Sequence, residues 1–138
     1  MPHYQVKMSQ QYSRPVEEIY AWLADHDSLG PLLKAPIKRI RAGEGGPNGV
    51  GSVRRIGPPL VGIEETVTAL EENRRIEYRI TRNGGPVRNH RGQLAFSPQD
   101  GGSRVDWTID FDALPGLGGL LERLLHRVIG GGLKRHAA

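Results

Sequence analysis

The chain has no cysteine, few aromatic residues and no long hydrophobic run. Without cysteine it has no disulfide framework, no thiol nucleophile and no thiolate ligand for a metal, which fits a reducing compartment. The N-terminal residues contain no apolar signal core, and no stretch approaches the roughly 20 apolar residues of a membrane-spanning helix. We therefore expect a cytoplasmic protein without stable membrane insertion.

The charge imbalance is small, with 19 Lys and Arg residues against 15 Asp and Glu residues. Basic residues cluster within residues 34–41 and 74–82, but aromatic residues make up only 6% of the chain. Nucleic-acid binding usually requires aromatic platforms among the basic residues, or a helix dense in Arg and Lys. The sequence therefore predicts a solvated basic surface and no nucleic-acid partner.

A chain of 138 residues with 37% hydrophobic and 25% charged residues is typical of one soluble globular domain with a real core. We find no internal repeat and no linker, so residues 1–138 are expected to form a single domain.

The most apolar periodic segment is residues 117–135, where the spacing predicts a long amphipathic helix. The residues expected on its buried face are Leu117, Leu120, Leu121, Leu124, Leu125, Val128 and Ile129. Glycine in a helix costs about 1 kcal/mol relative to alanine. Residues 130–132, three glycines in a row, therefore favour an ordered helix that stops near Gly130. The alternative is that the glycines allow close approach to the sheet or a bend.

Seven segments read as strands, and a helix begins near Val16 and ends around residues 25–27. The expected strands are residues 4–12, 37–41, 50–56, 61–70, 74–81, 87–96 and 105–112. Residues 28–36 form an irregular or helical connection. Short turns between successive strands make neighbours antiparallel, and the last helix is expected to cover their apolar face. The fold class is therefore α+β.

This order of segments resembles the START-like superfamily of helix-grip proteins, which includes the birch-pollen-allergen group and the bacterial polyketide cyclase/dehydrase and lipid-transport group. The residues that carry the resemblance are 13–25, 49–55, 65, 73–79, 91–92 and 102–108. The resemblance implies a curved seven-stranded antiparallel sheet around the C-terminal helix, with one or two short helices after the first strand and a mostly apolar cavity. It does not select an activity, because members include cyclases, hydrolases, carriers and hormone receptors.

Strand parity predicts which residues face the space between sheet and helix. The candidates for the cavity wall are Ile63, Tyr78, Phe96, Trp107, Ile109, Leu121 and Leu125. Arg54 shares this face unless the register slips by one residue, in which case Arg55 takes its place.

His90 and Glu65 are the candidate catalytic residues. A histidine on an apolar strand face can act as acid or base near neutral pH, or can be hydrogen-bonded within the wall. Glu65 can orient a substrate hydroxyl, pair with an arginine or face solvent. No metal site is expected, because the contiguous Asp25, His26 and Asp27 do not converge on one ion.

Three hypotheses follow for the function, of which the third is a protein-interaction module that binds an acidic partner through the basic outer face. The first is binding of a hydrophobic or aromatic small molecule, lipid-like or polyketide-like, by a monomer or weak homodimer without a cofactor. The second is a polyketide cyclase or dehydratase type of enzyme that uses His90 or Glu65 to move protons. The absence of a complete catalytic set favours binding, but the sequence does not decide whether the protein is an enzyme.

Overall fold

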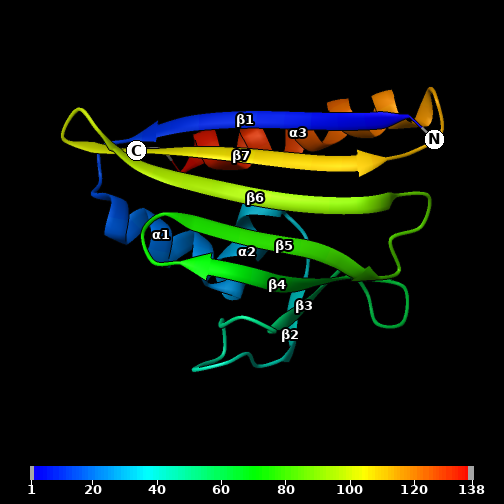
Figure 1. Cartoon of the computed structure of the whole chain (residues 1–138), viewed down its shortest axis with the longest axis horizontal. Coiled ribbons are helices and arrows are strands. Elements are labelled where there is room, and N and C mark those ends of the chain that lie inside the picture. Colours follow the sequence, from blue (N-terminus) through cyan, green and yellow to red (C-terminus); the bar gives the residue numbers. More distant parts are fainter. Residues whose placement is uncertain (1, 137–138) are drawn as a thin grey trace.

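The computed structural model describes residues 2–136, which form seven strands and three helices (Figure 1). The elements are β1 (His3–Tyr12), α1 (Val16–Ala24), α2 (His26–Leu33), β2 (Ile37–Arg41), β3 (Val53–Ile56), β4 (Ile63–Glu71), β5 (Arg75–Arg82), β6 (Arg88–Gln99), β7 (Gly102–Asp112) and α3 (Leu117–Arg135). Residues 50–52, predicted as strand, precede β3 as a turn in which Gly51 has a φ of 88°.

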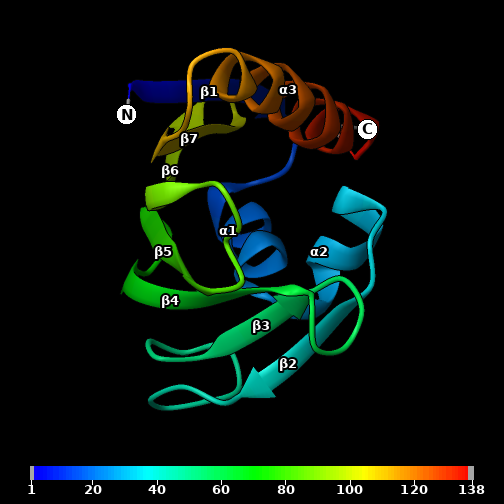
Figure 2. The same cartoon turned by 90° about the vertical axis from the view of Figure 1, so that its right-hand side faces the viewer.

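The strands form one antiparallel sheet in the order β1-β7-β6-β5-β4-β3-β2. Strands β2 to β7 are neighbours in chain order, as short turns between them require. The first strand is added at the far edge, where it pairs with β7 from His3↔Asp112 to Tyr12↔Ser103. Figure 2 shows that the sheet curves around the three helices. The predicted helix-grip fold is therefore confirmed.

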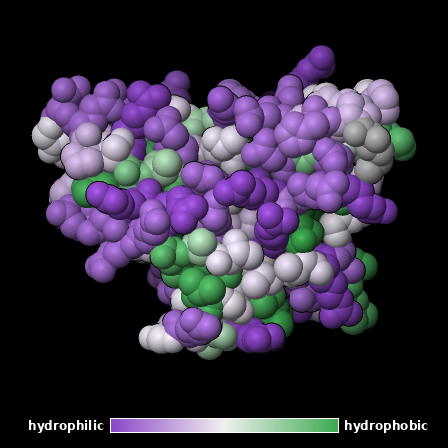
Figure 3. Space-filling view, in the orientation of Figure 1, coloured by the Kyte–Doolittle hydropathy of each residue, from purple (hydrophilic) through white to green (hydrophobic). Residues whose placement is uncertain are grey.

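The alternation along β7 separates the two faces of the sheet. Val105, Trp107, Ile109 and Phe111 are all buried, while the residues between them are half-buried on the outer face. On that face the surface over β1, β7 and β6 is almost entirely hydrophilic, whereas hydrophobic side chains gather around β4, β3 and β2 (Figure 3). The core therefore lies on the concave side, as the period-2 pattern predicted.

The concave face is covered by all three helices and not by α3 alone. Helix α1 contributes Ile19 and Leu23 to the buried core, and α2 contributes Leu29 and Leu32. The connection after α1 is helical because the Asp25 side chain caps α2 by accepting a hydrogen bond from the Asp27 amide at 3.0 Å. This short helix contacts the C-terminal half of α3 and so completes the core.

The preferred expectation that α3 would stop near Gly130 was wrong, because the helix continues to Arg135. Gly132 is buried against α2, where an added Cβ atom would overlap the carbonyl oxygen of Leu32. Near the other end, Gly118 faces the Tyr4 ring of β1 just as closely. Packing at these two glycines offsets their low helix propensity.

The expectation that all apolar residues of α3 would be buried was also wrong. Leu120 and Leu124 are 62% and 52% exposed, whereas Ile129 and Leu133 are buried. This part of the apolar stripe of α3 is therefore largely exposed, although Leu124 also lines the cavity described below. No helix in residues 2–136 is long and apolar enough to span a membrane.

Candidate functional site

A cavity of about 340 Å³ lies between the concave face of the sheet, α2 and residues 121–129 of α3. Its wall consists of Leu29, Leu33, Ala35, Arg54, Ile56, Ile63, Glu65, Tyr78, Ile80, Gly84, Val87, His90, Trp107, Ile109, Phe111, Leu121, Leu124, Leu125, Val128 and Ile129. Most of these residues are apolar. The volume falls in the range of pockets that bind small organic molecules.

The β-sheet register brings the polar residues of the wall together. Arg54 on β3 pairs with Glu65 on β4, and Glu65 pairs with Ile80 on β5. The first pairing resolves the choice between Arg54 and Arg55, because Arg54 is only 4% exposed and lines the cavity. Arg55 instead pairs with Glu64, whose side chain takes the opposite face of β4.

Arg54 and Glu65 form a buried ion pair. The Arg54 Nε donates to Glu65 Oε1 at 2.9 Å, and Arg54 Nη2 lies 2.8 Å from the same oxygen. The guanidinium carbon also lies 4.8 Å from the centre of the Tyr78 ring, in cation–π geometry. The two charges cancel, so the pair adds polarity to the wall without net charge.

Tyr78 is fixed by its neighbours on β6 and β7. Its hydroxyl oxygen accepts a hydrogen bond from Trp107 Nε1 at 2.9 Å. Gly92 pairs with Tyr78 across the strands, and a Cβ atom at that position would overlap the ring. Burial, and to a smaller extent Glu65, raises the pKa of Tyr78 above its usual value, so the phenol stays protonated.

His90 takes over a backbone hydrogen bond where the ladder between β5 and β6 ends. The last paired residues are Tyr78 and Gly92. Two residues further along β5, the amide of Ile80 donates to His90 Nδ1 at 3.0 Å. Because Nδ1 accepts, the neutral ring carries its proton on Nε2. Burial lowers the pKa of His90, and the nearby Arg54 lowers it further against the opposing effect of Glu65. The ring is therefore neutral near pH 7.

Nine of the ten predicted site residues line the cavity, including His90 and Glu65. The exception is Phe96, which is buried outside the wall with its ring edge-on to Tyr20 at 5.2 Å. It shares the inward face of β6 with His90. However, it lies six residues away, or roughly 20 Å along an extended strand. The alternation of residues along the strand correctly predicted the face on which Phe96 lies, but not its distance from the cavity.

The sequence did not identify the contribution of α2 and of two turns to the wall. Leu29, Leu33 and Ala35 line the side opposite the sheet, and Gly84 and Val87 close one end. The helical spacing of Leu29 and Leu33 was the available signal, but Gly30 and Pro31 obscured it.

Asp25 and Asp27 both approach Arg39, whereas His26 points into the interior. Arg39 lies 3.5 Å from Asp25 and 3.7 Å from Asp27, whereas the His26 ring is buried with Nε2 3.1 Å from Ser52 Oγ. Both members of the His26–Ser52 pair are sealed from solvent, so they are not accessible as a nucleophile and base.

Several solved structures share the fold. A protein from Nitrosospira multiformis has 20% sequence identity and a TM-score of 0.76, covering 98% of this chain and 97% of that one. The protein XoxI from Bacillus cereus has 22% identity and a TM-score of 0.71, covering 97% and 92%. The crystal structure of Ara h 8.0201 has 16% identity and a TM-score of 0.71, covering 99% and 98%. At these identities the likeness establishes the fold alone.

A search of curated proteins gave no match. In contrast, the family model described as polyketide cyclase / dehydrase and lipid transport matches residues 3–138. This match covers nearly the whole chain and agrees with the helix-grip architecture. The protein therefore belongs to the polyketide cyclase/dehydrase and lipid transport family, which confirms the resemblance inferred from its sequence.

Proposed function

We propose that the protein binds a hydrophobic or aromatic small molecule in the cavity beneath α3. The observation that carries this proposal is the cavity itself, with about 340 Å³ of mostly apolar space between the sheet and α3. An apolar ligand that fills such a cavity buries apolar surface and gains dispersion contacts, and both make binding favourable. Family membership supports the same function at a coarse level, because the family description includes lipid transport.

Catalysis by proton transfer is less well supported by the geometry. The basic lone pair of His90 on Nδ1 is already used by the Ile80 amide, so of the two candidates only Glu65, through Oε2, keeps a free lone pair. A general base needs a free lone pair within reach of the substrate proton. We therefore favour a binding protein over the cyclase or dehydratase alternative.

The first test is a cavity-filling variant with a matched surface control. Leu125→Trp places a larger side chain in the cavity, whereas Leu120→Trp makes the same change on the exposed side of α3. N-phenyl-1-naphthylamine, an uncharged dye that fluoresces in apolar surroundings, serves as the probe. We expect Leu125→Trp to weaken dye binding roughly tenfold or more by removing cavity volume. Leu120→Trp should leave binding unchanged.

Circular dichroism and the melting temperature establish that both variants are folded. Equal dye affinity in the two variants would contradict binding in this cavity. Mass spectrometry of the protein purified from cells, followed by organic extraction, then identifies the chemical class of a retained ligand.

A further inference from the structure

Besides Arg54 Nη1, two polar atoms in the wall of the cavity have no hydrogen-bond partner among residues 2–136. Arg54 engages only Oε1 of Glu65, which leaves Oε2 as a free acceptor. The Ile80 amide engages Nδ1 of His90, which leaves the Nε2 proton as a free donor. Neither atom is sealed in the protein interior, and both residues line the cavity. A free acceptor and a free donor in an apolar wall are suited to a ligand hydroxyl.

The sheet places Glu65 and His90 on either side of one residue. Ile80 is the cross-strand partner of Glu65, and its amide is bound by His90. The polar groups are therefore confined to one part of the wall. The wall formed by α3 offers only apolar side chains, those of Leu121, Leu124, Leu125, Val128 and Ile129. A ligand that satisfies both walls has an apolar body and one polar end.

The charges of the wall select an uncharged polar end. Arg54 and Glu65 cancel each other, and His90 is neutral because its Nδ1 accepts a hydrogen bond. A carboxylate ligand would add a negative charge beside Glu65 in a mostly apolar cavity, where an unpaired charge is costly. Glu65 leaves only Nη1 of Arg54 without a partner, so a carboxylate bound there would share one guanidinium with the Glu65 carboxylate. A hydroxyl incurs neither cost.

We propose that the ligand is an uncharged apolar or aromatic alcohol or phenol, whose hydroxyl donates to Glu65 Oε2 and accepts from His90 Nε2, and that the site excludes carboxylates of the same shape. This inference rests on the proposed binding function and specifies the polar group that the cavity recognises.

The test compares three probes with one carbon skeleton: 2-naphthol, naphthalene and 2-naphthoate. Each displaces N-phenyl-1-naphthylamine from the wild-type protein near neutral pH, where the naphthol is uncharged and the naphthoate is ionised. Hydrogen bonds to a charged acceptor contribute more than neutral ones, so we expect 2-naphthol to bind about tenfold more tightly than naphthalene. We expect 2-naphthoate to bind at least about tenfold more weakly than 2-naphthol.

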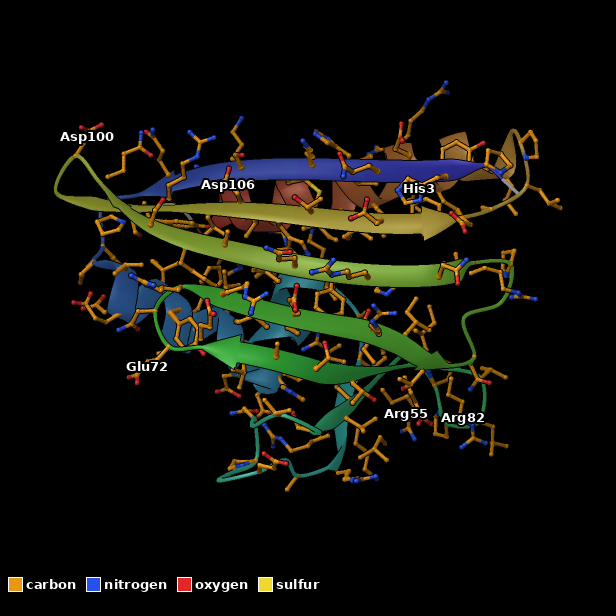
Figure 4. The ribbon with its side chains drawn as sticks, viewed as in Figure 1. His3, Arg55, Glu72, Arg82, Asp100 and Asp106 are labelled. Carbon is orange, nitrogen blue, oxygen red and sulfur yellow. The ribbon has the colours of Figure 1, made fainter. Side chains whose placement is uncertain are left out.

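Two single variants locate the effect at Glu65. Glu65→Gln removes the negative charge that pairs with Arg54. The ratio of the affinities of this variant for 2-naphthol and 2-naphthoate should therefore shift toward 2-naphthoate by about tenfold or more. Glu64→Gln is the matched control on the opposite face of β4, where Glu64 lies 3.7 Å from Arg82. Figure 4 shows Arg82 with Arg55 at this end of the sheet, away from the α3 wall. Glu64→Gln should keep the wild-type preference.

The double variant Arg54→Met with Glu65→Met covers the case in which Glu65→Gln does not fold. Replacing a buried ion pair by apolar side chains of similar size is often neutral for stability. This variant should still bind naphthalene but lose most of the preference for 2-naphthol.

Tight binding of 2-naphthoate to the wild type, or an unchanged preference in the double variant, would overturn the inference and leave the binding function intact. Failure of the dye and of all three probes to bind would overturn both.

Discussion

His26 is a fully buried histidine whose protonation opposes folding. Burial lowers its pKa from 6.5 to about 4, and the charges of Arg54 and Arg39 act in the same direction while Asp25 opposes them. Its Nδ1 atom has no partner among residues 2–136, so a proton added there would lack an acceptor. The unfolded chain takes up this proton below pH 6.5, whereas the folded protein takes it up only near pH 4.

We therefore predict that the free energy of unfolding falls by about 3 kcal/mol as the pH decreases from 6.5 to 4 through His26 alone. His26→Gln keeps an amide near Ser52 and removes the titration, so its stability should decrease less over this range. Urea unfolding at several pH values measures the difference. His126→Gln, at an exposed histidine on α3, is the control and should follow the wild-type curve. An identical slope in His26→Gln would exclude His26 as the cause.

Single residues also show which cavity-facing side chains can be predicted from the alternation along a strand. Parity placed Glu65 and His90 on the cavity side of their strands, and both line the cavity. It could not choose between Arg54 and Arg55, because a slip of one residue exchanges the faces and only the pairing of Arg54 with Glu65 fixes the register. Nor could it reveal that Ile80 would bind the ring of His90, since that contact replaces a regular ladder bond.

At the level of elements, the glycines of α3 show packing overriding propensity. Gly132 contacts the backbone of α2 at Leu32, whereas a Cβ atom at Gly131 would find only the end of the Arg135 side chain at 3.9 Å. The two glycines are adjacent in the same helix, so they differ mainly in what lies next to them.

This contrast gives a matched pair of variants. We predict that Gly132→Ala lowers the free energy of unfolding by about 1–3 kcal/mol, because α2 and α3 must separate. Gly131→Ala should raise it by up to about 1 kcal/mol through improved helix propensity. Thermal or urea unfolding of the two variants measures both effects. If Gly132→Ala is as stable as Gly131→Ala, the close approach of the helices is not required.

Elements with a strong local pattern were predicted well, and elements defined by their neighbours were not. The alternation of Val105, Trp107, Ile109 and Phe111 identified β7, and the spacing from residue 117 to 129 correctly indicated a helix, although its expected end near Gly130 was wrong. The helical state of residues 26–33 was left open, because Gly30 and Pro31 interrupt a short segment whose apolar face is defined only by contacts with α3 and the sheet.

For the whole molecule, the proposed binding of a ligand in the cavity is coupled to the stability of the fold. The cavity lies between α3 and the sheet, so a ligand that fills it binds the folded protein and not the unfolded chain. At a free concentration 100 times its dissociation constant, such a ligand adds about 2.7 kcal/mol to the free energy of unfolding.

We predict that this ligand concentration raises the melting temperature by roughly 10 °C for a domain of this size. Differential scanning fluorimetry with 2-naphthol measures the shift, and Leu125→Trp should show little or none. A similar shift in the cavity-filled variant would mean that the ligand stabilises another part of the protein.

The sequence by itself determined the strands, the long helix, the antiparallel order and the two alternating faces of a regular strand such as β7, because these depend on local periodicity and short turns. Tertiary structure decided the register of Arg54, the full length of α3, the position of Phe96 outside the wall and the exposure of Leu124. These depend on how far the sheet curves and on how closely α2 and α3 approach each other. Both are set by contacts between residues distant in the chain, and the cavity is the volume that those contacts leave unfilled.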